Sequence, residues 1–94
     1  MNTSPQTVSV DARPRVAGHF RLQWEAVQKS WVLLYPEGMV KLNGSAGEIM
    51  QRLDGERPGQ ALIDELERTF ETSGLAPDVL DFLAIALRQG WVKL

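Results

Sequence analysis

The sequence predicts an α+β domain of winged-helix-like type, in which a three-stranded antiparallel sheet is followed by three helices. Apolar and polar residues alternate between residues 20 and 42, which is the period of a strand. After residue 43 the apolar residues recur at the spacing of a helix. The chain has 94 residues, of which 44% are hydrophobic, so we expect one small domain with one modest core.

Three strands are expected in the first half of the chain. Residues 20–26 alternate strictly, which indicates a strand with one buried and one wet face. Residues 31–35 are apolar on both faces, as in a central strand, and residues 39–42 form a third strand after a Pro-Glu-Gly turn. The result is a meander whose first and third strands are edges. Trp24 or Trp31 is expected to pack between the sheet and the helices.

Three helices are expected in the second half. Ser45 and Glu48 have the spacing of a capping box, which predicts the start of the first helix. Pro58 opens the second helix and Pro77 opens the third, since a missing N–H costs nothing in the first turn. Gly90 closes the third helix.

The two ends of the chain are expected to behave differently. Residues 1–14 are polar and contain two prolines, so they predict a mobile N-terminal arm. Residues 15–94 then form the folded domain. Residues 91–94 are expected to be a short extended tail that docks through Trp91.

Composition excludes several classes of function. There is no cysteine and only one histidine, His19, which excludes zinc fingers, iron–sulfur clusters and thiol nucleophiles. Ten basic and twelve acidic residues give a net charge of −2, without the basic excess of a nucleic-acid binder. The longest apolar run, residues 82–87, is far shorter than the roughly 20 residues of a membrane span, and the N-terminus lacks a secretory signal. We therefore expect a cytoplasmic protein that is not an enzyme and that uses no cofactor or metal.

The expected third helix has more apolar surface than a core contact requires. The apolar arc of this helix spans about 200°, against somewhat over about 100° for an ordinary surface helix, and it consists of Val79, Leu80, Phe82, Leu83, Ala84, Ala86 and Leu87. Asp78, Phe82, Ile85 and Gln89 follow one line along the edge of that helix. This line is interpreted either as the wall of a groove for a partner, or as a core Phe82 beside one exposed apolar residue.

The expected third strand supplies a second candidate contact. Met39, Val40, Lys41 and Leu42 form an edge with unpaired main-chain N–H and C=O groups, which can accept another strand. The C-terminal tail, the N-terminal arm or a second copy of the chain are alternative occupants of this edge. Lys41 is interpreted either as protection against aggregation or as a contact for an acidic peptide.

A resemblance to a known family adds to these patterns. Its residues are Leu33 to Gly38 (LLYPEG), Leu42-Asn43, Ile49, Leu53 to Gly55, Phe70, Asp78-Val79, Phe82-Leu83 and Gly90. In order and spacing they resemble the pyrroloquinoline quinone (PQQ) biosynthesis protein D (PqqD) family, and the likeness runs from about Pro14 to Leu94. The sequence departs from the family at residues 57–59, where we expect a Ser or Thr cap for the second helix.

The resemblance implies a non-catalytic peptide chaperone of PQQ biosynthesis. Such a domain is called a RiPP recognition element, because it recognises the precursor of a ribosomally synthesised and post-translationally modified peptide (RiPP). Its partners would be the precursor peptide PqqA and the radical S-adenosylmethionine (SAM) enzyme PqqE, to which it presents PqqA. The peptide is expected to lie as an added strand between the third strand and the third helix. The two candidate contacts, residues 39–42 and the line from Asp78 to Gln89, would then form one peptide-binding site.

Other interpretations stay open at this point. A winged-helix DNA-binding domain needs an outward-facing basic or amide surface on its recognition helix, whereas the third helix offers Asp78 and Asp81 beside Arg88. A structural interaction domain is a further alternative, and the chain is compatible with a monomer or a homodimer. A competing binding geometry places a helical peptide on the acidic second helix, near Glu67 and Glu71.

Overall fold

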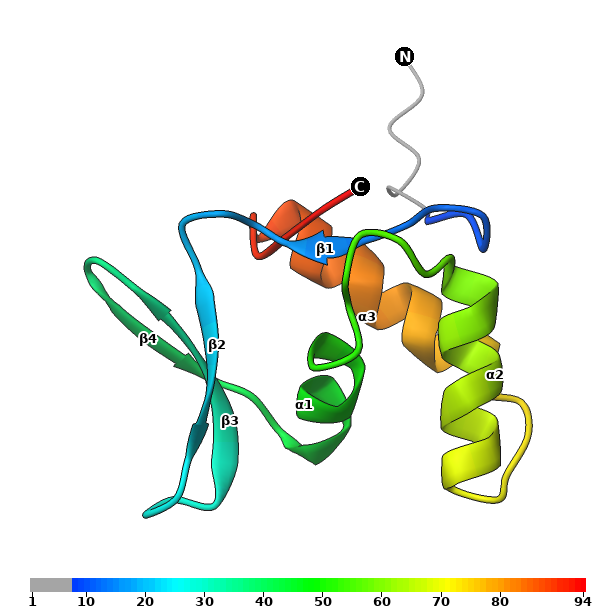
Figure 1. Ribbon diagram of the computed structural model, residues 1–94, viewed down its shortest axis with the longest axis horizontal. Coiled ribbons are helices and arrows are strands. Elements are labelled where there is room, and N and C mark those ends of the chain that lie inside the picture. The colour runs from blue at the N-terminus through cyan, green and yellow to red at the C-terminus, as the bar shows by residue number, and fades with distance from the viewer. Residues whose placement is uncertain (1–7) are drawn as a thin grey trace.

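Two small sheets and three helices make up residues 8–94, the part of the chain that this computed structural model describes (Figure 1). The larger sheet has the order β2-β3-β4. Its strands are β2 (Arg21–Glu25), β3 (Ser30–Tyr35) and β4 (Gly38–Lys41), and the helices that follow are α1 (Gly44–Met50), α2 (Gly59–Thr69) and α3 (Ala76–Arg88). This order confirms the predicted α+β, winged-helix-like arrangement.

A second, two-stranded sheet joins the two ends of the domain. β1 (Arg15–Val16) pairs antiparallel with β5 (Val92–Lys93), so that Val16 lies opposite Val92. The alternation pattern did not predict this pair, because two residues are too few to show a period. Trp91, directly before β5, packs against the core as expected for the tail.

The three-stranded sheet turns one face toward the helices. Leu22, Leu33 and Val40 lie opposite one another in the register of β2, β3 and β4, and all three pack into the same part of the core. Trp24 and Trp31 pair on that same face, but 48% of Trp24 stays exposed. Trp31 is therefore the tryptophan that packs between the sheet and the helices.

Gly47 allows α1 to approach the sheet closely. A Cβ atom built on Gly47 would lie 2.8 Å from Cδ1 of Trp31 and 3.1 Å from its Cβ and Cγ atoms. The missing side chain therefore sets the distance between α1 and β3.

The first helix begins two residues earlier than its capping pattern predicted. Asn43, not Ser45, is the N-cap: its backbone is extended and its Oδ1 accepts the N–H of Ala46 at 2.8 Å. The Ser45 hydroxyl donates to the same Oδ1 atom at 3.1 Å. The capping-box prediction was wrong because the chain leaves β4 at residue 41, and only Asn43 is both extended and able to accept a helix N–H.

The start of α2 is held by the segment that precedes β1. Pro58 is the N-cap and makes no side-chain cap bond. The main-chain carbonyl of Ala12 accepts the N–H of Gly59, and that of Val10 accepts the N–H of Gln60, both at 2.9 Å. These bonds satisfy donors that a helix start otherwise leaves without a partner.

Residues 8–14 therefore lie against the helices. Val8 is only 6% exposed and belongs to the core between α2 and α3, and Val10 and Ala12 pack against that core. The expectation of a mobile arm over residues 1–14 stays a prediction, and its first seven residues lie outside the described part of the chain.

The core has two parts that share two side chains. The first part lies between α2 and α3 and includes Leu62, Leu66 and Leu83. The second lies between the three-stranded sheet, α1 and α3. Leu53 and Phe82 pack against both parts, so they connect the sheet to the helices.

Charged side chains connect α1 to α2. The Arg52 guanidinium contacts a Glu48 carboxylate oxygen at 2.7 Å and a Glu65 oxygen at 2.8 Å, and Arg57 also pairs with Glu65. Burial of Arg52 disfavours its positive charge, but the hydrogen bonds to the two glutamates outweigh it and raise the pKa of Arg52. The network thus joins the end of α1 to α2 through partly exposed ion pairs.

The loop between these helices is organised by Asp54. Its carboxylate accepts the main-chain N–H of Arg57 at 2.8 Å and that of Glu56 at 2.9 Å. These hydrogen bonds favour the ionised form and lower the pKa of Asp54 below its usual 3.8.

Candidate peptide-binding site

The outer edge of β4 presents free main-chain groups. Among residues 8–94, β4 pairs only with β3, and the N–H of Leu42, just past the strand, donates to the carbonyl of Trp31 at 2.9 Å. In an antiparallel ladder the direction of these groups alternates from one residue to the next. The N–H of Val40 therefore also points toward β3, and those of Met39 and Lys41 point toward the free edge.

The side chains of β4 divide between the two faces of the sheet. Val40 packs against the core and Leu42 is buried in it. Met39 and Lys41 project from the opposite face, where they lie across from Leu34 and Val32. Residues 39 and 41 thus offer main-chain groups to a partner, while residues 40 and 42 shape the core beneath it.

The predicted line along α3 is exposed except at Phe82. Phe82 is half-buried and packs against both parts of the core, which agrees with the core interpretation of this side chain. Ile85 is 42% exposed, and Asp78 and Gln89 are exposed at the two ends of the helix. Phe82 and Val40 both pack against the part of the core that lies between the three-stranded sheet, α1 and α3.

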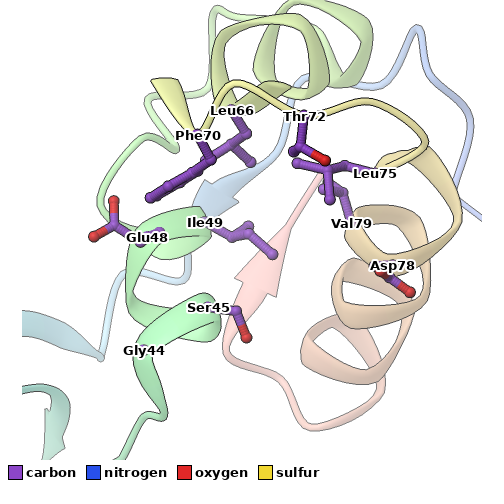
Figure 2. Close-up of a pocket in the computed structure, with 10 residues that line it drawn as sticks. All are labelled: Gly44, Ser45, Glu48, Ile49, Leu66, Phe70, Thr72, Leu75, Asp78 and Val79. Atoms are coloured by element: carbon purple, nitrogen blue, oxygen red, sulfur yellow. The ribbon is translucent and has the colours of Figure 1, made fainter. Parts of the chain in front are cut away.

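A pocket opens where the three helices meet. This three-helix pocket has a volume of about 530 Å³. It is lined by Gly44, Ser45, Glu48 and Ile49 of α1, Leu66 and Phe70 at the end of α2, Thr72 and Leu75 of the following loop, and Asp78 and Val79 of α3. Figure 2 shows Ile49 and Val79 facing each other from α1 and α3. Asp78 is the one member of the predicted site that reaches this pocket.

The described residues include neither a metal-binding cluster nor a membrane-spanning helix. His19 is exposed, and its ring lies 4.4 Å from that of Phe20. Within residues 8–94 no group of three or more His, Asp or Glu side chains is placed to hold a metal ion. None of the helices in this part of the chain has the length and apolarity needed to cross a membrane. The chemistry on offer is main-chain pairing, apolar contact and negative charge.

Comparison with known families decides the relationship. The sequence model described as Coenzyme PQQ synthesis protein D (PqqD) matches residues 30–92, which include β3, β4 and all three helices. The chain belongs to the PqqD family.

Several relatives in this family have been named for the peptide that they bind. The PqqA binding protein of Pseudomonas aeruginosa PAO1 is 47% identical over 87 residues, which are 92% of this chain and 95% of the relative. That of Azotobacter vinelandii is 46% identical over 86% of this chain and 89% of its own length. That of Klebsiella pneumoniae is 50% identical over 78% and 80%.

A solved structure shares the fold. It is the solution NMR structure of the PqqD truncation of Methylobacterium extorquens PqqCD, described as a functional, stand-alone RiPP recognition element. It matches with a TM-score of 0.82 and 23% identity, covering 98% of this chain and all of that one. The winged-helix-like arrangement is therefore that of a PqqD domain.

The PqqD fold also explains what the sequence patterns missed. The three-helix pocket depends on Ile49, Leu66 and Val79, which come together from three separate helices. Each was visible as an apolar position in a helical stripe. Nothing in a single stripe indicates that the three helices leave a cavity where they meet. Phe70 gave the one available signal, as a large apolar residue beside the polar loop that starts at Glu71.

Proposed function

We propose that this chain binds the peptide PqqA as an added strand at the β4 edge and presents it, chemically unchanged, to the radical SAM enzyme PqqE. The observation that carries the proposal is the free edge of β4, where the N–H groups of Met39 and Lys41 point away from β3. The names of the relatives support PqqA as the occupant of that edge.

Affinity and selection come from different parts of the site. Main-chain hydrogen bonds to β4 supply affinity for any extended peptide, and side-chain contacts select its sequence. Ile85 offers exposed apolar surface on α3, and Phe82 lies between it and the core. Asp78 and Gln89 add polar groups at the two ends of the same line.

Presentation to an enzyme follows from this mode of binding. A short free peptide samples many conformations, and ordering it costs free energy at the moment of binding. A peptide bound as a strand along β4 has already lost this conformational entropy and is confined to one extended shape. PqqE then binds a peptide whose conformation is already ordered, so less conformational entropy is lost when the enzyme binds it.

A titration followed by NMR tests where the peptide lies. ¹⁵N-labelled protein is mixed with PqqA of Pseudomonas aeruginosa, the peptide of a 47% identical relative. We expect amide shifts to cluster on residues 39–42 and 78–89. Shifts that cluster on residues 58–72 and spare those two segments would favour a helical peptide on α2 and contradict strand addition.

Two further measurements test what happens to the peptide. Mass spectrometry of PqqA after incubation with the protein alone should show no change, and a modified peptide would contradict the chaperone role. PqqE should then convert PqqA faster when the protein is added in equal amount. An equal rate with and without the protein, under conditions where PqqA is bound, would contradict presentation.

A further inference from the structure

The three-helix pocket is not occupied by a peptide that only pairs with β4. Its floor is part of the core: Ile49, Leu66 and Val79 are each less than 7% exposed. A floor made of packed core side chains is preformed, so binding a ligand there needs little free energy to order the pocket. At about 530 Å³ the cavity has the size of an ordinary ligand site.

The local sequence explains why the space stays open. Gly44 contributes no side chain and Ser45 a small one, on the side where α1 borders the cavity. The chain reverses after Thr69 through Glu71 and Gly74, both with positive φ, and carries the loop over the cavity. Phe70 is left 49% exposed at the rim. Covering a large exposed ring beside an apolar cavity removes apolar surface from water, which favours the binding of a partner there.

The charge at the mouth of the pocket is negative and partly uncompensated. Glu48 and Asp78 both line the pocket, but Glu48 is already paired with Arg52 at 2.7 Å. Asp78 makes no ion pair or side-chain hydrogen bond within residues 8–94. It lies in the first turn of α3, where the helix dipole stabilises a carboxylate. A positively charged partner group therefore finds an available carboxylate beside apolar walls.

The pocket begins a few residues after the end of β4 in the chain. Gly44 and Ser45 follow Lys41 by three and four residues, and they line the pocket while Lys41 presents the last free N–H of β4. Successive residues of a strand are about 3.3 Å apart. A peptide that runs along β4 past Lys41 therefore reaches the mouth of the pocket within a few residues.

We propose that the three-helix pocket takes one large apolar side chain of the peptide bound at the β4 edge, and that a Lys or Arg side chain near it in the peptide pairs with Asp78. This inference rests on the proposed function and adds the chemistry of the recognised sequence. The apolar side chain covers Phe70 and contacts the floor, and the basic group stays at the mouth, where solvent can still reach it.

Binding measurements on pocket variants test the inference. Ser45→Phe fills the pocket from α1 and should raise the Kd for Pseudomonas aeruginosa PqqA about tenfold or more. Asp78→Asn keeps the shape and removes the charge, and should raise the Kd about threefold or more at low salt. The matched controls are Gln60→Phe, at the far end of α2, and Asp81→Asn, one turn further along α3; both should bind within about twofold of the unaltered protein.

Charge exchange identifies the basic partner. Asp78→Lys should weaken the binding of PqqA. Among PqqA variants in which a single Lys or Arg is changed to Glu, one should bind the Asp78→Lys protein more tightly than unaltered PqqA does. If none of these peptide variants restores binding, the pairing with Asp78 is wrong.

A measurement on the unaltered protein guards against variants that fail to fold. The ¹³C methyl signals of Ile49 and Val79 should shift when PqqA saturates the protein. If PqqA binds and shifts the β4 amides but leaves both methyl groups and the Kd of Ser45→Phe unchanged, the pocket inference fails and the proposed function stands. If PqqA does not bind the unaltered protein at all, the proposed function itself fails.

Discussion

Replacing Gly47 by alanine should destabilise the protein, although alanine is the better helix former. The new methyl group would lie 2.8 Å from Cδ1 of Trp31 and 3.1 Å from its Cβ and Cγ atoms. Overpacking of this kind costs about 1–3 kcal/mol, and the Gly-to-Ala gain in a helix is at most about 1 kcal/mol. Because the Trp31 Cβ is fixed to the backbone of β3, the ring cannot simply turn away. We expect a net loss of about 1–2 kcal/mol in the free energy of unfolding.

The matched control for Gly47→Ala is Gly44→Ala in the same helix. A Cβ at Gly44 would meet no other atom within 4 Å, so this change should leave stability unchanged or raise it by up to about 1 kcal/mol. Urea and thermal unfolding followed by circular dichroism measure both variants. For a domain of this size the expected loss lowers the Tm of Gly47→Ala by about 4–16 °C. A Gly47→Ala variant as stable as the unaltered protein would refute the close contact between α1 and β3.

Three other changes test the edge, the core and the loop. Lys41→Pro removes a free-edge N–H and should abolish PqqA binding in a folded protein, whereas Val40→Pro removes an N–H that faces β3 and should unfold the sheet; the opposite result would invert the edge assignment. Trp31→Ala should lower the free energy of unfolding by about 3 kcal/mol, and Trp24→Ala by less than half of that, when both are measured by urea unfolding. Equal losses would contradict the finding that Trp31 is more buried than Trp24. Main-chain hydrogen bonds hold the pKa of Asp54 below 3.8, so they stabilise the fold above that pH and are lost as the pH falls through the lowered value. Asp54→Ala should therefore be less stable than the unaltered protein at pH 7, and the difference in stability should shrink as the pH falls below 3.8.

The sequence was sufficient for the order of β2, β3, β4 and the three helices because periodicity is a local property, but it did not show the short strands β1 and β5. The alternation around Trp24 and the apolar run around Trp31 each fixed a strand without reference to the rest of the chain. The same pattern could not decide which tryptophan is buried. That depends on where α1 crosses the sheet, and α1 crosses at Trp31 because Gly47 lets it approach.

The candidate site was predictable only in part, for a similar reason. The line from Asp78 to Gln89 follows from helix geometry alone, and the exposure of Ile85 on that line is confirmed. Which of Val40 and Lys41 offers its N–H to a partner depends on the pairing between β3 and β4, which a strand pattern leaves undetermined. The pocket depends on the meeting of three helices, and no single helix contains that information.

The pairing of β1 with β5 also determines how the domain responds to a pulling force. Arg15 lies opposite Lys93 and Val16 opposite Val92, so the chain enters and leaves this ladder at the same end. Tension between the two ends therefore opens the ladder one pair at a time, as a zipper opens, and does not shear both pairs together. Joined to a neighbouring protein at both ends, the domain would yield first at residues 8–14, β1 and β5, before β4 and α3 unfold. Mechanical strain from such a fusion would thus spare the surface that we assign to the peptide.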